Sequence, residues 1–342
     1  MAKILVVTKD IAEYLLYSVL ASALRARGHI VSVVAEGLSL AKWRESGETV
    51  CAFSGADSRR FLTEFKPNLV LTGLASPINL GESFGLAANE LGVKLGFVAD
   101  IWGAEARSRA VPDFVCTLDQ FGLDKILQYP KYQGRVPRVY ITGSPAMDRL
   151  LDVKNPGAIW DGVRDSRLVV LFVGQDESTT PALEGLVQAL NVGGEYVLIP
   201  FFHPKRPDLL GEWNGILARA TFPVLRTPQV SLHQAMKIAW VTMSVYSTAL
   251  IEAAALGSLP VSWVSPIGRQ KMREALGGLE RFPLVDSGCT IEVETPEEFR
   301  QAVLDLGQTA YWAKIRHCQY QLGCDGKNTK RVAAAVENEL RV

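Results

Sequence analysis

Hydroxyl side chains cluster where an apolar stretch of the second half meets an Ala-rich segment. Ser244, Ser247 and Thr248 follow the expected strand 240–243 and precede a short helix. A helix N-terminus presents free N–H groups and a positive dipole end, so this turn is suited to binding phosphate. Glu252 lies one turn beyond Thr248 on the same helix face, where a carboxylate can accept hydrogen bonds from ribose hydroxyls. The segment predicts a nucleotide diphosphate site with a ribose clamp, and an ordinary strand–helix unit with a Ser/Thr cap explains it equally well.

Two other strand ends of the second half carry polar groups suited to the same ligand. His203 follows the expected strand 196–200, and its imidazole can donate to a phosphate oxygen; a solvent-facing loop histidine is the alternative that we favour less. Gly174 and Gln175 follow the strand 168–173, where a glycine lets a ligand approach the backbone and an amide can contact phosphate. A helix cap over 176–180 explains the residues after Gln175 equally well.

The remaining polar loops have a weaker connection to a ligand. Arg226 and Gln229 lie in a loop whose backbone groups can read a base edge, and a plain loop is as compatible with them. His29, His233 and His317 lie at a strand start or on expected helices. We interpret these three histidines as structural.

Three carboxylates of the first half are candidates for a general base, which must lie within hydrogen-bond reach of the reacting hydroxyl. Asp10 follows the first strand, and Asp100 and Glu105 follow the strand 94–99. We favour Asp100, while each of the three is also explained as a loop carboxylate.

Continuous Val, Ile and Leu runs alternate with helical patterns, which predicts parallel sheets covered on both faces. In the first half the expected strands are 3–8, 29–35, 69–72, 94–99, 113–117 and 138–142, and the expected helices are 11–27, 58–65, 82–91 and 120–128. In the second half the expected strands are 168–173, 196–200, 222–226, 240–243 and 260–264, and the expected helices are 181–190, 231–238, 295–306 and 328–340. Ligands of such sheets bind beyond the carboxyl ends of the strands.

At 342 residues the chain is too long for one typical core. Apolar periodicity fades over 152–166, the expected linker. We therefore predict an α/β fold with two doubly wound, Rossmann-like domains that face each other across a cleft, 1–151 and 167–327. The turn at Gly143 and Ser144 is expected to line that cleft, a common place for small-molecule sites.

Composition excludes several classes of function. Lys and Arg total 36 and Asp and Glu total 36, which gives no support for nucleic-acid binding and leaves membrane contact at most peripheral. The five scattered cysteines favour a reducing, cytoplasmic compartment, and the N-terminus has the pattern of a strand rather than a signal peptide. A homo-oligomer is compatible with the sequence. No G-x-G-x-x-G follows the first strand and no G-x-x-x-x-G-K-[ST] occurs, which argues against a dinucleotide-dependent dehydrogenase and a P-loop enzyme.

The order of these motifs resembles the GT-B group of glycosyltransferases and its relatives, the non-hydrolysing UDP-N-acetylglucosamine 2-epimerases and the CDP-glycerol glycerophosphotransferases. The segment from Thr142 to Asp148 is similar to a T-G-N/S-x-x-x-D block of the family, and His203-Pro204 is similar to its strand-end His-Pro pair. The segment from Ser244 to Glu252 is similar to its S-x-x-S-T-x-x-x-E-A block. The tail 328–342 resembles the helix that crosses back to the first domain in this fold.

The resemblance implies a glycosyltransferase of polysaccharide or glycoconjugate biosynthesis. Its second domain would bind a nucleotide-sugar donor, and its first domain a carbohydrate or other hydroxyl acceptor. His203, Ser247 and Thr248 would hold the diphosphate and Glu252 the ribose, with no bound metal and no cofactor. The turn departs from the Ser-Gly-Gly turn of the epimerases, and a second His-Pro pair, typical of the glycerophosphotransferases, does not occur. A sugar-nucleotide 2-epimerase and a non-catalytic nucleotide-binding protein of this fold remain alternatives.

Overall fold

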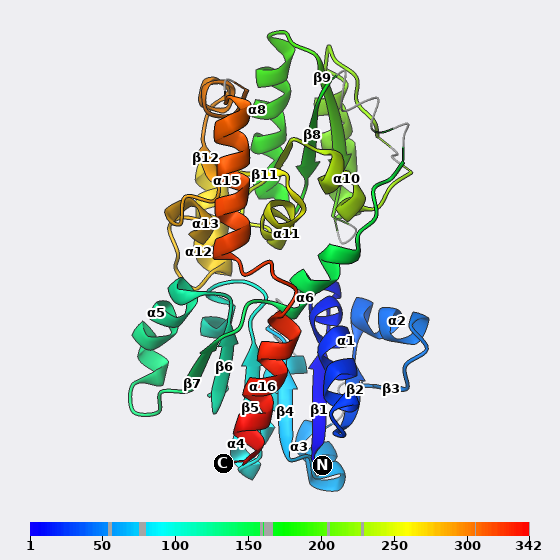
Figure 1. The fold of residues 1–342 in the computed structure, drawn as a ribbon, viewed down its shortest axis with the longest axis vertical. Coiled ribbons are helices and arrows are strands. Elements are labelled where there is room, and N and C mark those ends of the chain that lie inside the picture. Colours follow the sequence, from blue (N-terminus) through cyan, green and yellow to red (C-terminus); the bar gives the residue numbers. More distant parts are fainter. Residues whose placement is uncertain are drawn as a thin grey trace. The chain divides into compact units, whose positions relative to one another are not determined.

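A computed structural model of the chain describes residues 1–53, 57–74, 80–157, 160, 167–203, 206–226, 229–304 and 306–341 (Figure 1). The chain forms two compact units: the first contains residues 1–149, 275–277 and 323 to the C-terminus, and the second contains residues 150–274 and 278–322. Each unit is built on one parallel sheet, so the expected α/β class is confirmed. No helix among the described residues has both the length and the apolar character needed to cross a bilayer.

The first unit has a seven-stranded sheet in the order β3-β2-β1-β4-β5-β6-β7. Its strands are β1 (Lys3–Thr8), β2 (Ile30–Ala35), β3 (Val50–Ala52), β4 (Leu69–Thr72), β5 (Lys94–Val98), β6 (Phe114–Thr117) and β7 (Arg138–Ile141). Its helices are α1 (Ile11–Ala26), α2 (Gly37–Glu45), α3 (Ser58–Phe65), α4 (Leu80–Leu91), the 3-10 helix η1 (Ala104–Arg107), α5 (Gln120–Gln128), α6 (Pro145–Asp148) and α16 (Asn328–Arg341). The last helix, α16, packs against α1 and α6 and contributes Val332 and Val336 to the core of this unit.

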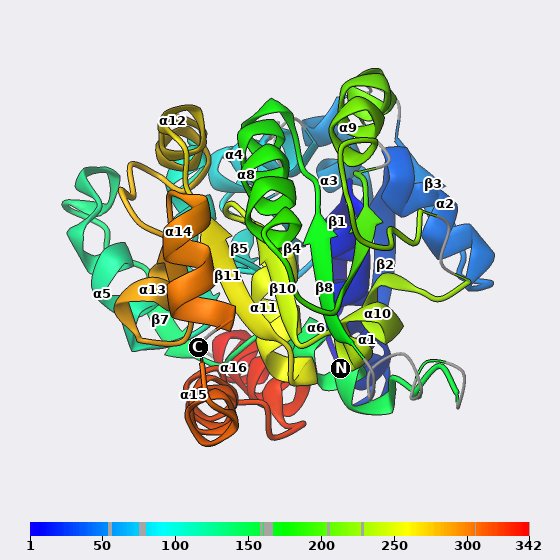
Figure 2. The same cartoon turned by 90° about the horizontal axis from the view of Figure 1, so that it is seen from above.

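The second unit has a five-stranded sheet in the order β12-β11-β10-β8-β9. Its strands are β8 (Leu168–Val173), β9 (Tyr196–Phe201), β10 (Val241–Ser244), β11 (Leu259–Trp263) and β12 (Ile291–Val293). Its helices are η4 (Glu177–Thr179), α8 (Thr180–Asn191), α9 (Leu210–Leu217), α10 (Leu232–Ile238), α11 (Thr248–Leu256), α12 (Pro266–Ala275), α13 (Pro283–Asp286), α14 (Pro296–Phe299) and α15 (Gln308–Gln321). Helices α8 and α9 pack on one face of this sheet and α10 and α11 on the other (Figure 2).

Each sheet has a switch point, where successive connections leave in opposite directions. In the first sheet β1 pairs with β2 on one side and with β4 on the other. In the second sheet β8 pairs with β9 on one side and with β10 on the other. Ligands of doubly wound sheets bind at the carboxyl ends of the strands beside such points.

Some local expectations were wrong. The expected strand 222–226 forms only an isolated bridge between Leu198 and Val224. Pro223 on one side and Pro200 on the other lack the N–H groups that a longer ladder needs, so pairing stops after one step. The expected helix 295–306 is α14 followed by a π-helical turn, Arg300–Leu304. Within the expected linker, residues 153–157 have no regular secondary structure, and 158–159 and 161–166 lie outside the described residues.

Candidate functional site

The turn after β10 starts helix α11 at the carboxyl edge of the second sheet. Ser247 is the N-cap, and its hydroxyl accepts a hydrogen bond from the Ala249 N–H at 3.2 Å. Thr248 is the first helical residue and is half-buried. The nine-residue helix ends at Gly257, so the local interpretation of this segment is confirmed for its secondary structure.

Ser244 and Gln175 join the ends of β10 and β8 across the switch point of the second sheet. The fully buried Ser244 hydroxyl lies 2.8 Å from the Val173 carbonyl oxygen and 3.1 Å from Gln175 Oε1. Gln175 Oε1 also accepts from the Tyr246 N–H at 3.2 Å. A Cβ on Gly174 would lie 3.0 Å from the Trp213 ring, so this glycine is needed for packing. These contacts hold the turn in place, and the Ser244 hydroxyl forms its hydrogen bonds with groups of the protein.

Glu252 lies one turn along α11 and pairs with a histidine of α10. Its Oε2 is 3.2 Å from His233 Nε2, and the side chains are 13% and 26% exposed, respectively. The pair orients one carboxylate oxygen of Glu252 while both groups remain reachable from solvent. Sequence reasoning treated His233 as structural. It could not show the pairing, because the two residues are 19 positions apart in the chain and meet only when α10 packs against α11.

The loops after β9 and after residue 222 hold the other candidates for donor binding. His203 is half-buried, and its carbonyl oxygen accepts from the Arg206 N–H at 3.0 Å. Pro204 and Lys205, which follow His203, lie outside the described residues. Arg226 and Gln229 are exposed, and the Arg226 guanidinium donates to Asn214 Oδ1 at 3.2 Å.

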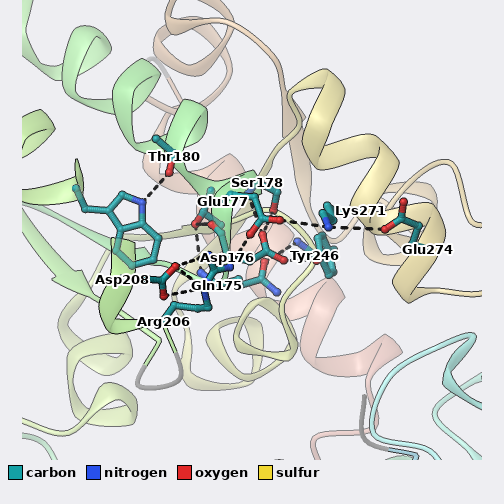
Figure 3. Close-up of polar contacts among 12 residues, drawn as sticks. Gln175, Asp176, Glu177, Ser178, Thr180, Arg206, Asp208, Tyr246, Lys271 and Glu274 are labelled. Carbon is teal, nitrogen blue, oxygen red and sulfur yellow. Dashed lines mark hydrogen bonds and ion pairs between the residues drawn. The ribbon is translucent and has the colours of Figure 1, made fainter. Parts of the chain in front are cut away.

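A charged network follows the carboxyl ends of β8, β9, β10 and β11, and sequence reasoning did not identify it (Figure 3). The Tyr246 hydroxyl donates to Asp176 Oδ2 at 2.8 Å. Glu177 is paired with Arg206 at 2.5 Å and with Lys271 at 3.2 Å. The hydrogen bond from Arg206 is the main cause that lowers the pKa of Glu177 to about 2. The local sequence indicated only a cap, which Asp176 does provide.

Two of the candidate bases, Asp10 and Asp100, follow strands of the first sheet. Asp10 caps α1, since its carboxylate accepts from the Glu13 N–H at 3.1 Å. The pKa of Asp100 is raised to about 6, mainly by burial and also by the charge of Asp10, while the charge of Arg107 lowers it. A pKa near 6 suits Asp100 to accepting a proton near neutral pH.

Glu105 differs from Asp100 because it is enclosed by the protein. It is 1% exposed, and neither carboxylate oxygen has a hydrogen-bond partner among the described residues. Burial raises its pKa to about 7. The Lys131 ammonium donates to the Glu105 carbonyl oxygen and, at 2.8 Å, to that of Ser108. We therefore rank Glu105 below Asp100 as a base for an acceptor that arrives from solvent.

The turn at Gly143 seats the last helix on the first unit. Gly143 has φ +68°, and a Cβ there would lie 2.1 Å from Asn328 Oδ1. The Asp148 carboxylate accepts from the N–H groups of Asn328 at 3.2 Å and of Thr329 at 2.7 Å, and so caps α16. Ser144 is 1% exposed, and its hydroxyl has no partner among the described residues. These contacts give Gly143 and Asp148 a structural role within the first unit.

Side chains of the types that bind metals are scattered within the described ranges. These ranges contain no group of three or more His, Cys, Asp or Glu side chains arranged to hold a metal ion.

No family model and no curated protein matches the chain. Solved structures do match it over nearly its full length. The MnaA protein of S. aureus with UDP is 15% identical and has a TM-score of 0.78, with 100% of this chain and 97% of that chain covered. The UDP-GlcNAc 2-epimerase of Neisseria meningitidis bound to UDP-GlcNAc is 13% identical with a TM-score of 0.74, at 98% and 100% coverage. A glycosyltransferase of Rickettsia africae is 11% identical with a TM-score of 0.66, at 99% and 98% coverage. The chain therefore has the GT-B fold, with one Rossmann-like sheet in each unit.

Proposed function

We propose that the protein transfers a sugar from a nucleotide-sugar donor to a hydroxyl acceptor, and that the second unit binds the donor. The observation that carries the proposal is the Ser247-capped start of α11, with the Glu252–His233 pair one turn along the helix. Both lie at the carboxyl edge of the sheet, where this fold class binds ligands. Two structures of the same fold contain UDP or UDP-GlcNAc, which supports a nucleotide-sugar ligand.

In this proposal the diphosphate of the donor lies at the N-terminus of α11. The free N–H groups and dipole of the helix favour negative charge there, and His203 at the end of β9 adds a donor. Glu252 accepts hydrogen bonds from the ribose hydroxyls, and His233 holds its carboxylate in place. The backbone near Gln229 contacts the base.

The transfer step is a displacement at the anomeric carbon. The acceptor oxygen bonds to that carbon while the bond from the carbon to the phosphate oxygen breaks, and the proton of the acceptor hydroxyl passes to Asp100. The negative charge that develops on the leaving diphosphate is stabilised by preorganised donors at the start of α11 and needs no metal ion. Asp100 has a pKa of about 6, so it is largely ionised and able to accept a proton at pH 7.

A sugar-nucleotide 2-epimerase is the second candidate. It is favoured by the fold comparison, since the TM-score to the Neisseria epimerase is 0.74 and that to the Rickettsia glycosyltransferase is 0.66. The turn after Ser244, with Val245 and Tyr246 in place of two glycines, supports the transferase. An epimerase acts on the nucleotide sugar alone, whereas a transferase also requires a hydroxyl acceptor.

The test incubates the purified protein with a panel of nucleotide sugars, with and without hydroxyl acceptors. Released nucleoside diphosphate is quantified, and the sugar configuration is followed by NMR. Diphosphate release that depends on an acceptor supports the transferase, and conversion at the sugar C2 carbon without an acceptor supports the epimerase. Thermal stabilisation by a nucleotide without turnover indicates a non-catalytic binding protein, and no stabilisation by any nucleotide contradicts the whole assignment.

A further inference from the structure

Glu177 bridges two cations that come from different loops at the carboxyl edge of the second sheet (Figure 3). Its Oε2 lies 2.5 Å from a terminal nitrogen of Arg206, and its Oε1 lies 3.2 Å from the Lys271 ammonium. Arg206 follows β9, Lys271 lies on α12 after β11, and Glu177 begins η4 after β8. The tertiary structure thus places one carboxylate between two positive charges that are far apart in sequence.

The arrangement around Glu177 matches the way that Arg and Lys bind a phosphate. Arg206 uses its other nitrogens for Asp208, at 2.7 and 3.0 Å, which fixes the guanidinium and directs the remaining nitrogen to Glu177. A guanidinium held in this way and an ammonium are the donors that proteins use for phosphate oxygens. The side chains of Arg206 and Lys271 are 28% and 34% exposed, so an anion from solvent can reach them.

The network is connected to the proposed donor site. The Tyr246 hydroxyl is bound to Asp176, next to Glu177, and Tyr246 directly precedes Ser247, the cap of α11. The hydrogen bond from Arg206 and the proximity of Lys271 lower the pKa of Glu177 to about 2. Glu177 therefore stays ionised at neutral pH and competes with other anions for the two cations.

We propose that Glu177 is an internal anion that occupies a phosphate position of the donor site, and that an incoming diphosphate displaces it from Arg206 and Lys271. The inference rests on the proposed function, in which this edge of the sheet binds the donor. In this proposal Glu177 is a built-in competitor that neutralises the two cations of the donor site. A ligand with two phosphate charges displaces the carboxylate more readily than a ligand with one.

The test compares Glu177→Gln with the wild type in calorimetric titrations with inorganic pyrophosphate and with UDP at low ionic strength. We expect the variant to bind pyrophosphate about fivefold more tightly, because the competing charge is gone while both cations remain. Arg206→Gln should weaken binding of the same probe. Glu184→Gln is the matched control, since Glu184 pairs with Arg219 at 2.9 Å on the same unit and should leave the affinity unchanged.

Equal or weaker binding of pyrophosphate by Glu177→Gln overturns the inference. If both proteins bind and turn over a nucleotide sugar but the variant binds no more tightly, the inference fails and the proposed function stands. If the variant binds pyrophosphate more tightly but neither protein binds any nucleotide, the anion site stands and the donor function fails.

Discussion

The carboxyl edges of the two sheets contain acidic side chains in opposite electrostatic states. At the first edge, burial raises the pKa of Asp100 to about 6. Glu105, in the segment that follows, reaches about 7 by the same cause. At the second edge, Arg206 and Lys271 lower the pKa of Glu177 to about 2. The same sheet architecture thus contains two carboxyl groups that exchange protons near neutral pH, Asp100 and Glu105, and a third, Glu177, that stays ionised.

The difference follows from what surrounds each carboxylate. Burial disfavours the charged form, whereas a cation at hydrogen-bond distance favours it. A group with a pKa near the working pH is suited to general base catalysis, and a permanently ionised pair is suited to binding ions. The comparison supports the proposal that the first unit provides proton transfer and the second unit provides anion binding.

The largest expected effect belongs to Asp100. Asp100→Asn removes the proposed base, so turnover should fall about a hundredfold or more while donor affinity is unchanged. In the wild type, kcat/KM should rise with pH through about 6, because the base works only when deprotonated. Steady-state kinetics from pH 5 to pH 8 measures both effects.

Asp10→Asn is the matched control for Asp100→Asn. Asparagine also caps helices, so α1 should be retained. The substitution removes a negative charge that raises the pKa of Asp100, so the pH profile should move to lower pH with little loss of maximal turnover. Full activity of Asp100→Asn would assign the base elsewhere.

The second effect concerns stability and the buried Glu105. Its pKa rises from an ordinary 4.5 to about 7 in the folded state, so folding binds a proton, and stability is lost as pH rises from 4.5 through 7. Glu105→Gln cannot ionise, so its stability relative to the wild type should increase by about 3 kcal/mol between pH 4.5 and pH 8. Urea unfolding at the two pH values measures this, and a difference that is independent of pH would contradict it.

A third, smaller effect concerns the stability that a cap gives to a helix N-terminus, and two helices differ in this respect. α16 is capped from another element by Asp148, whereas α11 is capped by its own Ser247. Asp148→Ala should lower the free energy of unfolding of the first unit by about 1–2 kcal/mol and speed hydrogen exchange at the start of α16. Asp152→Ala, at an exposed position, should change neither measurement.

The smallest expected effect belongs to the proposed ribose contact. Glu252→Gln weakens an acceptor of hydrogen bonds and its pairing with His233, so donor affinity should fall about fivefold with the fold unchanged. Calorimetric titration with a nucleotide sugar measures the change. Glu212→Gln, exposed on α9, should leave the affinity unchanged, and normal donor binding by Glu252→Gln would remove Glu252 from the site.

Local sequence signals predicted most of the fold. Continuous apolar runs gave β1, β4 and β8 with correct bounds, and polar caps with apolar periodicity gave α3 and α5. Neighbouring residues decide these features, since a strand depends on its own side-chain pattern and a helix start on its own cap. The same reasoning failed at 222–226, where Pro223 interrupts an otherwise apolar run.

Contacts between distant residues could not be predicted. No local pattern shows that His233 meets Glu252 or that Asp148 caps the helix beginning at Asn328, because these pairs form only when helices dock. The bridge from Glu177 to Lys271 depends on the order of strands in the sheet, which brings the loops after β8 and β11 to one edge.

The sequence by itself determined the parallel α/β architecture, the capped start of α11 and the residue types at the strand ends, because periodicity and capping act within a few residues. The tertiary structure decided the charge state of those residues. Asp100 and Glu177 are both acidic residues that follow a strand, and only burial in one case and two cations in the other separate their pKa values, about 6 and about 2.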